Sequence, residues 1–276
     1  MTTTTHDDYV LGRSPEEHER LRAQARFWEP ETARLLDRIG IARGARCLDV
    51  GCGTGEVMRL MAERAGPHGQ VTGIDVDDGL GARAVEDLHA AGHRQCRFEA
   101  LDVEAGDVPA DAPYDLVFAR LLLIHMDDPA AVLRRLWEWV APGGHLVVQD
   151  YDLLTGAVVP ALGIVEEFRR IAIDTFLRAG RDVRIGLRLP AVHAEAGIGA
   201  PDGMDAGARV GTLRELAPMY EAVYRSLQPA AVALELTTDE RSERWLEAFA
   251  RETAGADDRA ALWPLLIGTH KRKATA

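Results

Sequence analysis

The sequence lacks the features that mark several functional classes. It has 3 cysteines in 276 residues, an odd number too small for a disulfide framework, and no Cys-x-x-Cys pair that would suggest a zinc site. No apolar run approaches the ~18 residues that a membrane span needs. The N-terminus has neither the basic nor the apolar segment of a secretory signal. We therefore expect a globular, cytoplasmic protein without a disulfide framework, a membrane partner or a metal site.

Positive charge is also scarce. Lys and Arg total 32 against 44 Asp and Glu, which gives a formal net charge of −12. Phosphate backbones repel such a chain, so we do not expect nucleic acid as a partner. The dense basic cluster at 270–273 is interpreted as a solvated C-terminal tail.

The middle of the chain alternates between short apolar segments and amphipathic helical segments. This alternation predicts a parallel sheet with helices on both faces, doubly wound because the crossovers are right-handed. Ligands of such sheets bind beyond the C-terminal ends of the strands. The expected strands are 47–50, 70–74, 97–101, 114–119 and 145–149, the expected helices are 56–65, 80–91 and 129–140, and 141–144 is expected to be a turn.

The flanking regions are predicted to be mainly helical. Two amphipathic helices precede the first strand, one capped by Ser14 and one restarting at Pro30. After residue 153 we expect helices at 165–179, 187–196, 213–227 and 240–253, a weak strand at 203–211 and a late strand at 262–268. The predicted regions are an N-terminal helical segment (1–40), a ligand-binding core (41–152), a helical cap with late strands (153–260), and a final strand with a basic tail (261–276).

A glycine-rich loop follows the first expected strand. Gly51, Gly53 and Gly55 permit positive φ and let a ligand approach the backbone, while the helix that follows presents its free N–H groups. Twenty residues later Asp75 ends the second strand, where an acid in nucleotide-binding α/β folds accepts hydrogen bonds from ribose hydroxyls. A dinucleotide fold uses the same logic, but its fingerprint needs a small residue at the position that Glu56 occupies here.

The segment Asp49-Val50-Gly51-Cys52-Gly53-Thr54-Gly55 resembles motif I of the class I S-adenosylmethionine (SAM)-dependent methyltransferases. It is similar to the branch that includes the ubiquinone and menaquinone C-methyltransferases and many natural-product tailoring enzymes. Supporting marks follow in the same order at 73–75, 101–103, 114–117 and 136–144. The resemblance covers the chain from about residue 30 to about residue 150. It implies a Rossmann-like, mostly parallel seven-stranded sheet and SAM as cofactor, with S-adenosylhomocysteine (SAH) as product.

The resemblance also implies roles at the methionine end of the cofactor. The backbone at Gly51, Gly53 and Gly55 would face the methionine moiety, and Asp49 would lie near its ammonium group. Arg120 would face the same end of the cofactor or the substrate.

At the nucleoside end the implied contacts come from the next two strand ends. Asp75 would hold the ribose and Val76 would line the adenine. Asp102 would accept a hydrogen bond from the adenine amine, with the Val103 backbone beside it. The cofactor carries ammonium, hydroxyl and amine donors, for which these acids are suitable acceptors.

Further candidates lie outside these motifs. Tyr9 and Gln24 belong to an N-terminal segment that in similar enzymes folds over the cofactor, whereas Trp28 is expected in the core. His125 is the candidate general base, with a structural role as its alternative.

Substrate contacts are expected just past the fifth strand and in the cap. Tyr151 and Asp152 occupy the first position, and Phe168 belongs to a group of cap residues that suggests an apolar or aromatic acceptor. That group comprises Phe168, Ile171, Phe176, Tyr220 and Tyr224.

These observations favour methyl transfer to a carbon, oxygen or nitrogen atom of a small molecule, as in secondary metabolism. Three alternatives stay open at this point: a SAM-binding enzyme that couples or replaces methylation with cyclisation, an NAD-dependent oxidoreductase, and a non-enzymatic binding module. The N-terminal helices could pack on their own subunit or on a partner's, so a homodimer is open as well.

Overall fold

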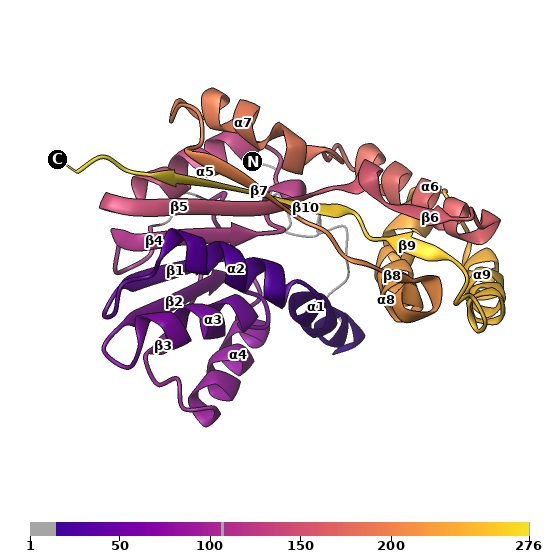
Figure 1. Ribbon diagram of the computed structural model, residues 1–276, viewed down its shortest axis with the longest axis horizontal. Coiled ribbons are helices and arrows are strands. Elements are labelled where there is room, and N and C mark those ends of the chain that lie inside the picture. The colour runs from indigo at the N-terminus through magenta and orange to yellow at the C-terminus, as the bar shows by residue number, and fades with distance from the viewer. Residues whose placement is uncertain (1–14, 106–107, 276) are drawn as a thin grey trace, which may run out of the picture. The chain divides into compact units, whose positions relative to one another are not determined.

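Figure 1 shows the computed structural model, which describes residues 15–105 and 108–275. The chain forms two compact units. Unit 1 contains Met1–Arg20, Asp152–Arg184 and Ala208–Leu265, and unit 2 contains Leu21–Tyr151, Ile185–Gly207 and Leu266–Ala276. No helix of the described residues is both long and apolar enough to cross a membrane.

Unit 2 is built on a seven-stranded sheet in the order β3-β2-β1-β4-β5-β10-β7. The pairs β1–β2, β1–β4, β2–β3 and β4–β5 are parallel, whereas β7 and β10 are antiparallel to each other. The predicted Rossmann-like, mostly parallel seven-stranded sheet is therefore confirmed. Its strands are β1 (Arg46–Val50), β2 (Gln70–Asp75), β3 (Cys96–Ala100), β4 (Tyr114–Arg120), β5 (Val140–Asp152), β7 (Gly203–Gly207) and β10 (Leu265–Arg272).

Helices connect and cover these strands. Helix α2 packs beside α3, α3 lies on β1 and β2, α4 lies on β3, and α5 packs beside α7. Leu35, Met58 and Phe118, all fully buried, belong to the core between them. The helices of this unit are α1 (Pro15–Phe27, which begins in unit 1), α2 (Glu29–Ile39), α3 (Glu56–Ala65), α4 (Asp78–Ala90), the 3-10 turn η1 (Leu123–His125), α5 (Pro129–Glu138) and α7 (Ile185–Glu195).

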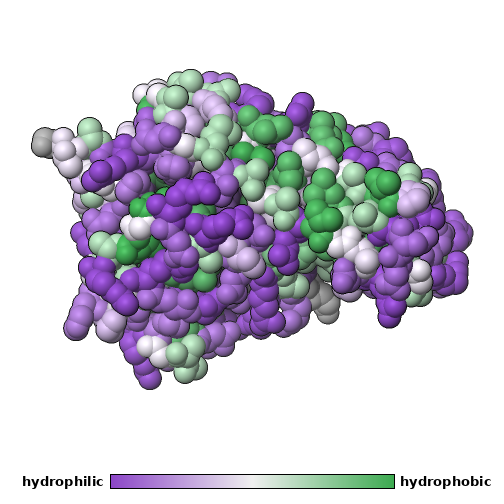
Figure 2. Space-filling model, in the orientation of Figure 1, coloured by the Kyte–Doolittle hydropathy of each residue, from purple (hydrophilic) through white to green (hydrophobic). Residues whose placement is uncertain are grey.

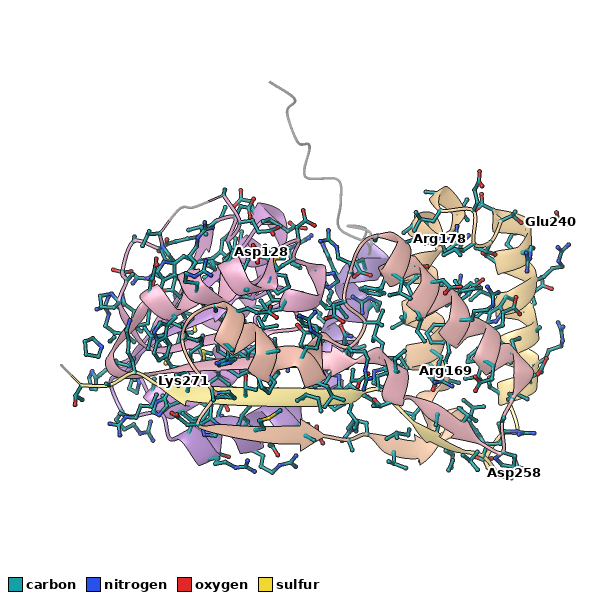
Figure 3. All side chains as sticks on the ribbon, turned by 90° about the horizontal axis from the view of Figure 1, so that it is seen from above. Asp128, Arg169, Arg178, Glu240, Asp258 and Lys271 are labelled. Carbon is teal, nitrogen blue, oxygen red and sulfur yellow. The ribbon has the colours of Figure 1, made fainter. Side chains whose placement is uncertain are left out.

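Polar side chains cap two of these helices at the end of the strand-to-helix loops. The Asp77 carboxylate accepts from the Leu80 N–H at the start of α4. Asp128 accepts from the Ala131 N–H at the start of α5, where Figure 3 labels it. Such caps satisfy one of the free amide groups of each first turn and fix where each helix begins.

Unit 1 packs three helices and a small sheet around aromatic side chains. The sheet has the antiparallel order β6-β9-β8. Tyr224 and Trp245 stack with ring centroids 3.9 Å apart, and Phe168, Tyr220 and Phe249 pack around them. Its elements are η2 (Leu153–Thr155), β6 (Ala157–Val159), α6 (Gly163–Arg178), β8 (Val210–Thr212), α8 (Leu213–Ala233), α9 (Asp239–Thr253) and β9 (Ala260–Leu262).

The two faces of the small sheet differ in exposure. Val158 and Ala261, which are paired in register, are buried. Val159 and Val210 are 66% and 70% exposed, and apolar residues gather in Figure 2 where Figure 1 draws β6 and β9. Because side chains alternate between the faces of a strand, one face of this sheet joins the core of unit 1 and the other does not.

Three expected elements differ from the structure. The expected turn at 141–144 is part of β5. The pairing of β5 with β4 shifts in register at this point, between Tyr114 and Leu116. The expected strand at 203–211 is two strands, β7 and β8, in two different sheets. The late strand at 262–268 is likewise divided at Trp263-Pro264, because proline lacks the N–H that a continuous ladder needs.

The interpretation of 270–273 as a solvated tail is wrong. His270–Arg272 continue β10, where Figure 3 labels Lys271, and the Arg272 N–H donates to Asp202 Oδ2 at 2.7 Å. Lys273 Nζ donates to the carbonyls of Trp137 and Val140, both at 2.8 Å. The cations are therefore placed by pairing and by carbonyl acceptors, which a count of charges does not show.

Candidate active site

The glycine loop joins β1 to α3 in a left-handed path. Gly51, Gly53 and Gly55 have φ values of 70°, 50° and 78°. The N–H groups of Gly51 and Cys52 both donate to the Ile74 carbonyl, which ties the loop to β2. A Cβ added at Gly51 would lie 3.0 Å from Leu122 Cδ1. The loop is thus a backbone surface, and the first turn of α3 has no side-chain cap at Gly55 to occupy its amide groups.

Asp75, at the end of β2, faces this loop. Its Oδ2 accepts from the Gly53 N–H at 2.9 Å and its Oδ1 from the Asp77 N–H at 3.0 Å. Burial raises the pKa of Asp75, while these backbone donors oppose the rise. A carboxylate offers about four acceptor positions. Asp75 therefore keeps acceptor capacity for two further donors such as ribose hydroxyls.

Asp49, in β1 directly before the loop, is a buried acid with an unmatched oxygen. It is 2% exposed, and its Oδ2 has no hydrogen-bond partner among the described residues. Burial raises its pKa to about 7, opposed by the positive charge of Arg120 and aided by the negative charge of Asp75. A buried, unpaired carboxylate oxygen is costly, so this atom suits a ligand that brings a positive donor.

Arg120 supplies the opposite charge from the end of β4. It is half-buried, and burial lowers its pKa while Asp49 opposes that effect. Its Nη1 donates to Thr32 Oγ1 at 3.0 Å. The next residue, Leu121, has a positive φ of 55°, a strained conformation for leucine that is typical of functional sites.

Tyr151 lies near the end of β5, and side chains of the N-terminal helices donate hydrogen bonds to its hydroxyl oxygen. Its hydroxyl oxygen accepts from Trp28 Nε1 at 2.5 Å and from Gln24 Nε2 at 3.2 Å. Trp28 is fully buried, which confirms its predicted place in the core. Gln24 and Tyr151 are thus brought together in one hydrogen-bonded group.

The side predicted for adenine is formed by the loops after β2 and β3. Val76 is 46% exposed, unusual for a valine and suited to an apolar ring. Asp102 Oδ1 accepts from the Glu104 N–H at 2.8 Å, and the carbonyl of Val103 accepts from Arg135. Val103 itself is buried.

His125 ends the 3-10 turn η1 and is half-buried. The turn is fixed by Asp150, whose carboxylate accepts from the Ile124 N–H at 3.1 Å and from the Tyr151 N–H at 2.9 Å. Asp150 is fully buried. It therefore links the segment that carries His125 to the end of β5.

The remaining sequence-based candidates are not among the described residues of unit 2. Tyr9 falls outside the described residues. Asp152 belongs to unit 1, where it accepts from the Leu154 N–H at 3.0 Å and from Arg184 at 3.3 Å. Phe168 is buried in the aromatic core of unit 1. Their predicted contacts stay predictions.

Sequence reasoning missed three residues of this site: Thr32, Gln149 and Asp150. Thr32 follows Trp28 by four residues and Gln24 by eight, so helical spacing places all three on one face. That spacing is a signal that was present in the sequence, whereas nothing local distinguishes Gln149 or Asp150. Within the described part of the chain no group of three or more His, Cys, Asp or Glu side chains is arranged to hold a metal ion.

A comparison with known proteins identifies the family of the chain. Residues 19–175, more than half of the chain, match the family described as "Methyltransferase domain". The chain belongs to this methyltransferase family.

Similar curated proteins carry methyltransferase names. Phosphoethanolamine N-methyltransferase of Triticum aestivum is 34% identical over 122 residues, which cover 44% of this chain and 23% of that protein. Trans-aconitate 2-methyltransferase of Variovorax paradoxus is 36% identical over 131 residues, covering 46% and 48%. Aklanonic acid methyltransferase of a Streptomyces species is 31% identical over 125 residues, covering 45% and 56%. The matched segment thus spans from a quarter to about half of these relatives.

Solved structures share the fold at low identity. A putative methyltransferase of Bacillus halodurans superposes with a TM-score of 0.58 at 16% identity, covering 89% of this chain and all of that one. A phosphoethanolamine N-methyltransferase of Haemonchus contortus, solved with phosphomonomethylethanolamine and SAH, has a TM-score of 0.50 at 16% identity, covering 88% and 52%. These likenesses support the Rossmann-like methyltransferase fold.

Proposed function

We propose that this methyltransferase-family protein transfers a methyl group from SAM to a small molecule and releases SAH. The observation that carries the proposal is the buried Oδ2 of Asp49, an acceptor without a hydrogen-bond partner among the described residues, which directly precedes a glycine loop of left-handed backbone. The family and the named relatives support the same reaction class.

The residues present fit the proposed cofactor. Asp49 would accept from the ammonium group, Asp75 from the ribose hydroxyls, and the amide groups of the loop would face the methionine moiety. The remaining proposed contacts are Tyr9, Gln24, Gly51, Gly53, Gly55, Val76, Asp102, Val103 and Arg120.

Bound SAM supplies a methyl group already activated by a positive sulfur. The chain's contribution is alignment of the acceptor with the C–S bond and exclusion of water, and alignment alone can supply much of the rate. A hydroxyl acceptor would need a base, for which His125 is the proposed residue, whereas an amine can react without one. Tyr151, Asp152 and Phe168 remain the proposed substrate contacts.

The acceptor is proposed to be a small metabolite. The cap side chains Phe168, Ile171, Phe176, Tyr220 and Tyr224 are buried in unit 1. An apolar or aromatic acceptor therefore stays a proposal, and one relative is named for aklanonic acid. The other relatives are named for phosphoethanolamine and trans-aconitate, so acceptor tests should include charged molecules.

Two assignments about the protein's setting stay proposals. A reducing, cytoplasmic location agrees with free, buried Cys47, Cys52 and Cys96. The homodimer suggested by the N-terminal helices remains to be measured by light scattering.

Calorimetric titration with SAH tests the cofactor. We expect wild type to bind at micromolar concentration and Asp75→Ala to bind about 30-fold more weakly, because charge-assisted hydrogen bonds to the ribose are lost. Asp37→Ala, an exposed acid paired with Arg64, is the control and should match wild type. An undiminished affinity in Asp75→Ala would exclude the proposed site. Incubation with SAM and an acceptor library should then give a product heavier by one methylene unit.

A further inference from the structure

A polar stripe runs along the N-terminal helices of unit 2. It consists of Gln24, Trp28 and Thr32, each four residues after the last. Gln24 and Trp28 hold Tyr151, as described above, and Thr32 holds Arg120. The stripe therefore contacts side chains from the ends of two strands, β4 and β5.

Thr32 is the best-defined member of the stripe. It is fully buried, and its hydroxyl donates to Gln149 Oε1 at 2.8 Å while accepting from Arg120 Nη1 at 3.0 Å. The amide oxygen of Gln149 can only accept, so it fixes the direction of the hydroxyl hydrogen. The oxygen lone pairs of Thr32 are thereby turned toward the guanidinium.

Gln149 of the neighbouring strand β5 also fixes the backbone after Arg120. The Leu121 N–H donates to the Gln149 carbonyl at 2.8 Å, so Gln149 anchors both the chain after Arg120 and the hydroxyl that holds its side chain. Arg120 forms no salt bridge with any described residue, and Thr32 is the described side chain that it donates to. Its remaining guanidinium donors are available for a ligand.

The charges around this arginine form a matched pair. Arg120 and Asp49 interact electrostatically, each shifting the other toward its charged form. A carboxylate beside a guanidinium is complementary to an α-amino acid, whose ammonium and carboxylate carry the opposite charges. Arginine binds carboxylates with parallel hydrogen bonds when its plane is held in place.

We propose that Thr32 is a positioning residue that holds Arg120 against the carboxylate of the cofactor's amino-acid end. Asp49 and Arg120 then select nucleosides that carry an amino acid, and Thr32 sets the geometry of that selection. This inference rests on the proposed function, since it assigns one end of the proposed SAM site.

The test compares two ligands that share the adenosine and the thioether. SAH carries the amino acid, whereas 5′-methylthioadenosine lacks it. In Thr32→Val we expect SAH to bind about tenfold more weakly, the effect of a charge-assisted hydrogen bond lost from Arg120. Binding of 5′-methylthioadenosine should change less than twofold, which also shows that the variant is folded. Thr32→Ser keeps the hydroxyl and should restore SAH binding.

A matched control exists on β2. Thr72 is likewise fully buried, and its hydroxyl accepts from Arg97 Nε at 3.0 Å. Thr72→Val removes the same type of bond away from Arg120, so it should leave the ratio of the two affinities at the wild-type value. A double-mutant cycle with Arg120→Gln completes the design, because Thr32→Val should no longer weaken SAH binding once the guanidinium is absent.

Each outcome is decisive. Equal weakening of both ligands in Thr32→Val would show a merely structural role and overturn the inference. A Thr32→Val effect that persists in the Arg120→Gln background would overturn it as well. Wild-type protein that binds both ligands equally would refute the amino-acid subsite, including the proposed contact of Asp49 with the ammonium group, but not methyl transfer from SAM itself, whereas failure to bind either ligand would refute both.

Discussion

Asp49 is a single residue whose burial works against the stability of the fold. Its carboxylate is buried, one of its oxygens has no hydrogen-bond partner in the part of the chain that the structure describes, and its pKa is raised from 3.8 to about 7. Between pH 3.8 and about pH 7, Asp49 of the folded protein holds a proton that the same residue of the unfolded chain has released. The free energy of unfolding therefore falls as pH rises through this range.

Replacing this acid should separate stability from binding. At pH 8 and without cofactor, we expect Asp49→Asn to raise the free energy of unfolding by about 2 kcal/mol, part of the roughly 4 kcal/mol that a shift of this size represents. At pH 4, near the ordinary pKa, the two proteins should be nearly equal. Urea unfolding at both pH values measures this, with Asp37→Asn as the exposed control. An Asn variant less stable than wild type at pH 8 would contradict the assignment.

The same substitution should weaken SAH binding, because a neutral amide cannot attract the ammonium group. In wild type the affinity should rise between pH 6 and pH 8 as Asp49 loses its proton. A flat pH profile in Asp49→Asn, measured by calorimetry, would identify this residue as the source of the wild-type slope.

At this scale the sequence predicted the position of Asp75 at the glycine loop better than the positions of the side chains that support the candidate site. The spacing from Gly55 to Asp75 is typical of the fold and predicts that Asp75 lies at the glycine loop. Its carboxylate does accept from the Gly53 N–H there. Gln149 and Asp150 could not be placed from the sequence, because their roles depend on which strand lies beside β5. Thr32 was within reach, because its helical spacing from Gln24 and Trp28 places it on their face.

At the scale of helices and strands, the features that local sequence determines were predicted, and those that depend on distant pairing partners were not. Helices α3 and α5 begin where the glycine loop and Pro129 predict, since such signals act within one turn. The expected turn at 141–144 and the single strands at 203–211 and 262–268 differ because pairing partners decide them. Residues 203–212 divide between two sheets because β7 pairs with β10 in the seven-stranded sheet, whereas β8 pairs with β9 in the small sheet.

The contact of β2 with the glycine loop gives an element-scale prediction. A Cβ at Gly73 would lie 2.5 Å from Met58 Sδ and 2.8 Å from Cys52 Sγ. We expect Gly73→Ala to lower the free energy of unfolding by about 1–3 kcal/mol, the usual cost of overpacking, and to weaken SAH binding because α3 and the loop must shift.

Gly163→Ala is the matched control, because an added Cβ there meets nothing within 4 Å. It begins α6 and should be neutral or slightly stabilising. Urea midpoints and SAH titrations of both variants measure the contrast. A Gly73→Ala variant that unfolds with the wild-type midpoint would contradict the close packing of β2 on α3.

On the scale of the whole molecule, the described cofactor candidates belong to unit 2 and the aromatic core to unit 1. We expect Phe168→Ala to lower the stability of unit 1 by about 3 kcal/mol through the cavity it leaves. SAH affinity should stay within twofold of wild type, since the described cofactor candidates belong to unit 2. Hydrogen exchange, which resolves the two units, together with SAH titration, measures both. A large loss of SAH affinity would tie Phe168 to the cofactor site.

The order of the strands in unit 2 has a consequence for synthesis on the ribosome. Strand β10 lies between β5 and β7, although it follows the six other described strands of this sheet along the sequence. While it is still inside the exit tunnel, β5 and β7 each lack the neighbour that completes their ladder. Such a nascent chain carries open strand edges that invite pairing with other chains. The main sheet can therefore close only after β10 has been translated and has left the exit tunnel, so chaperone protection of these strand edges matters most until then.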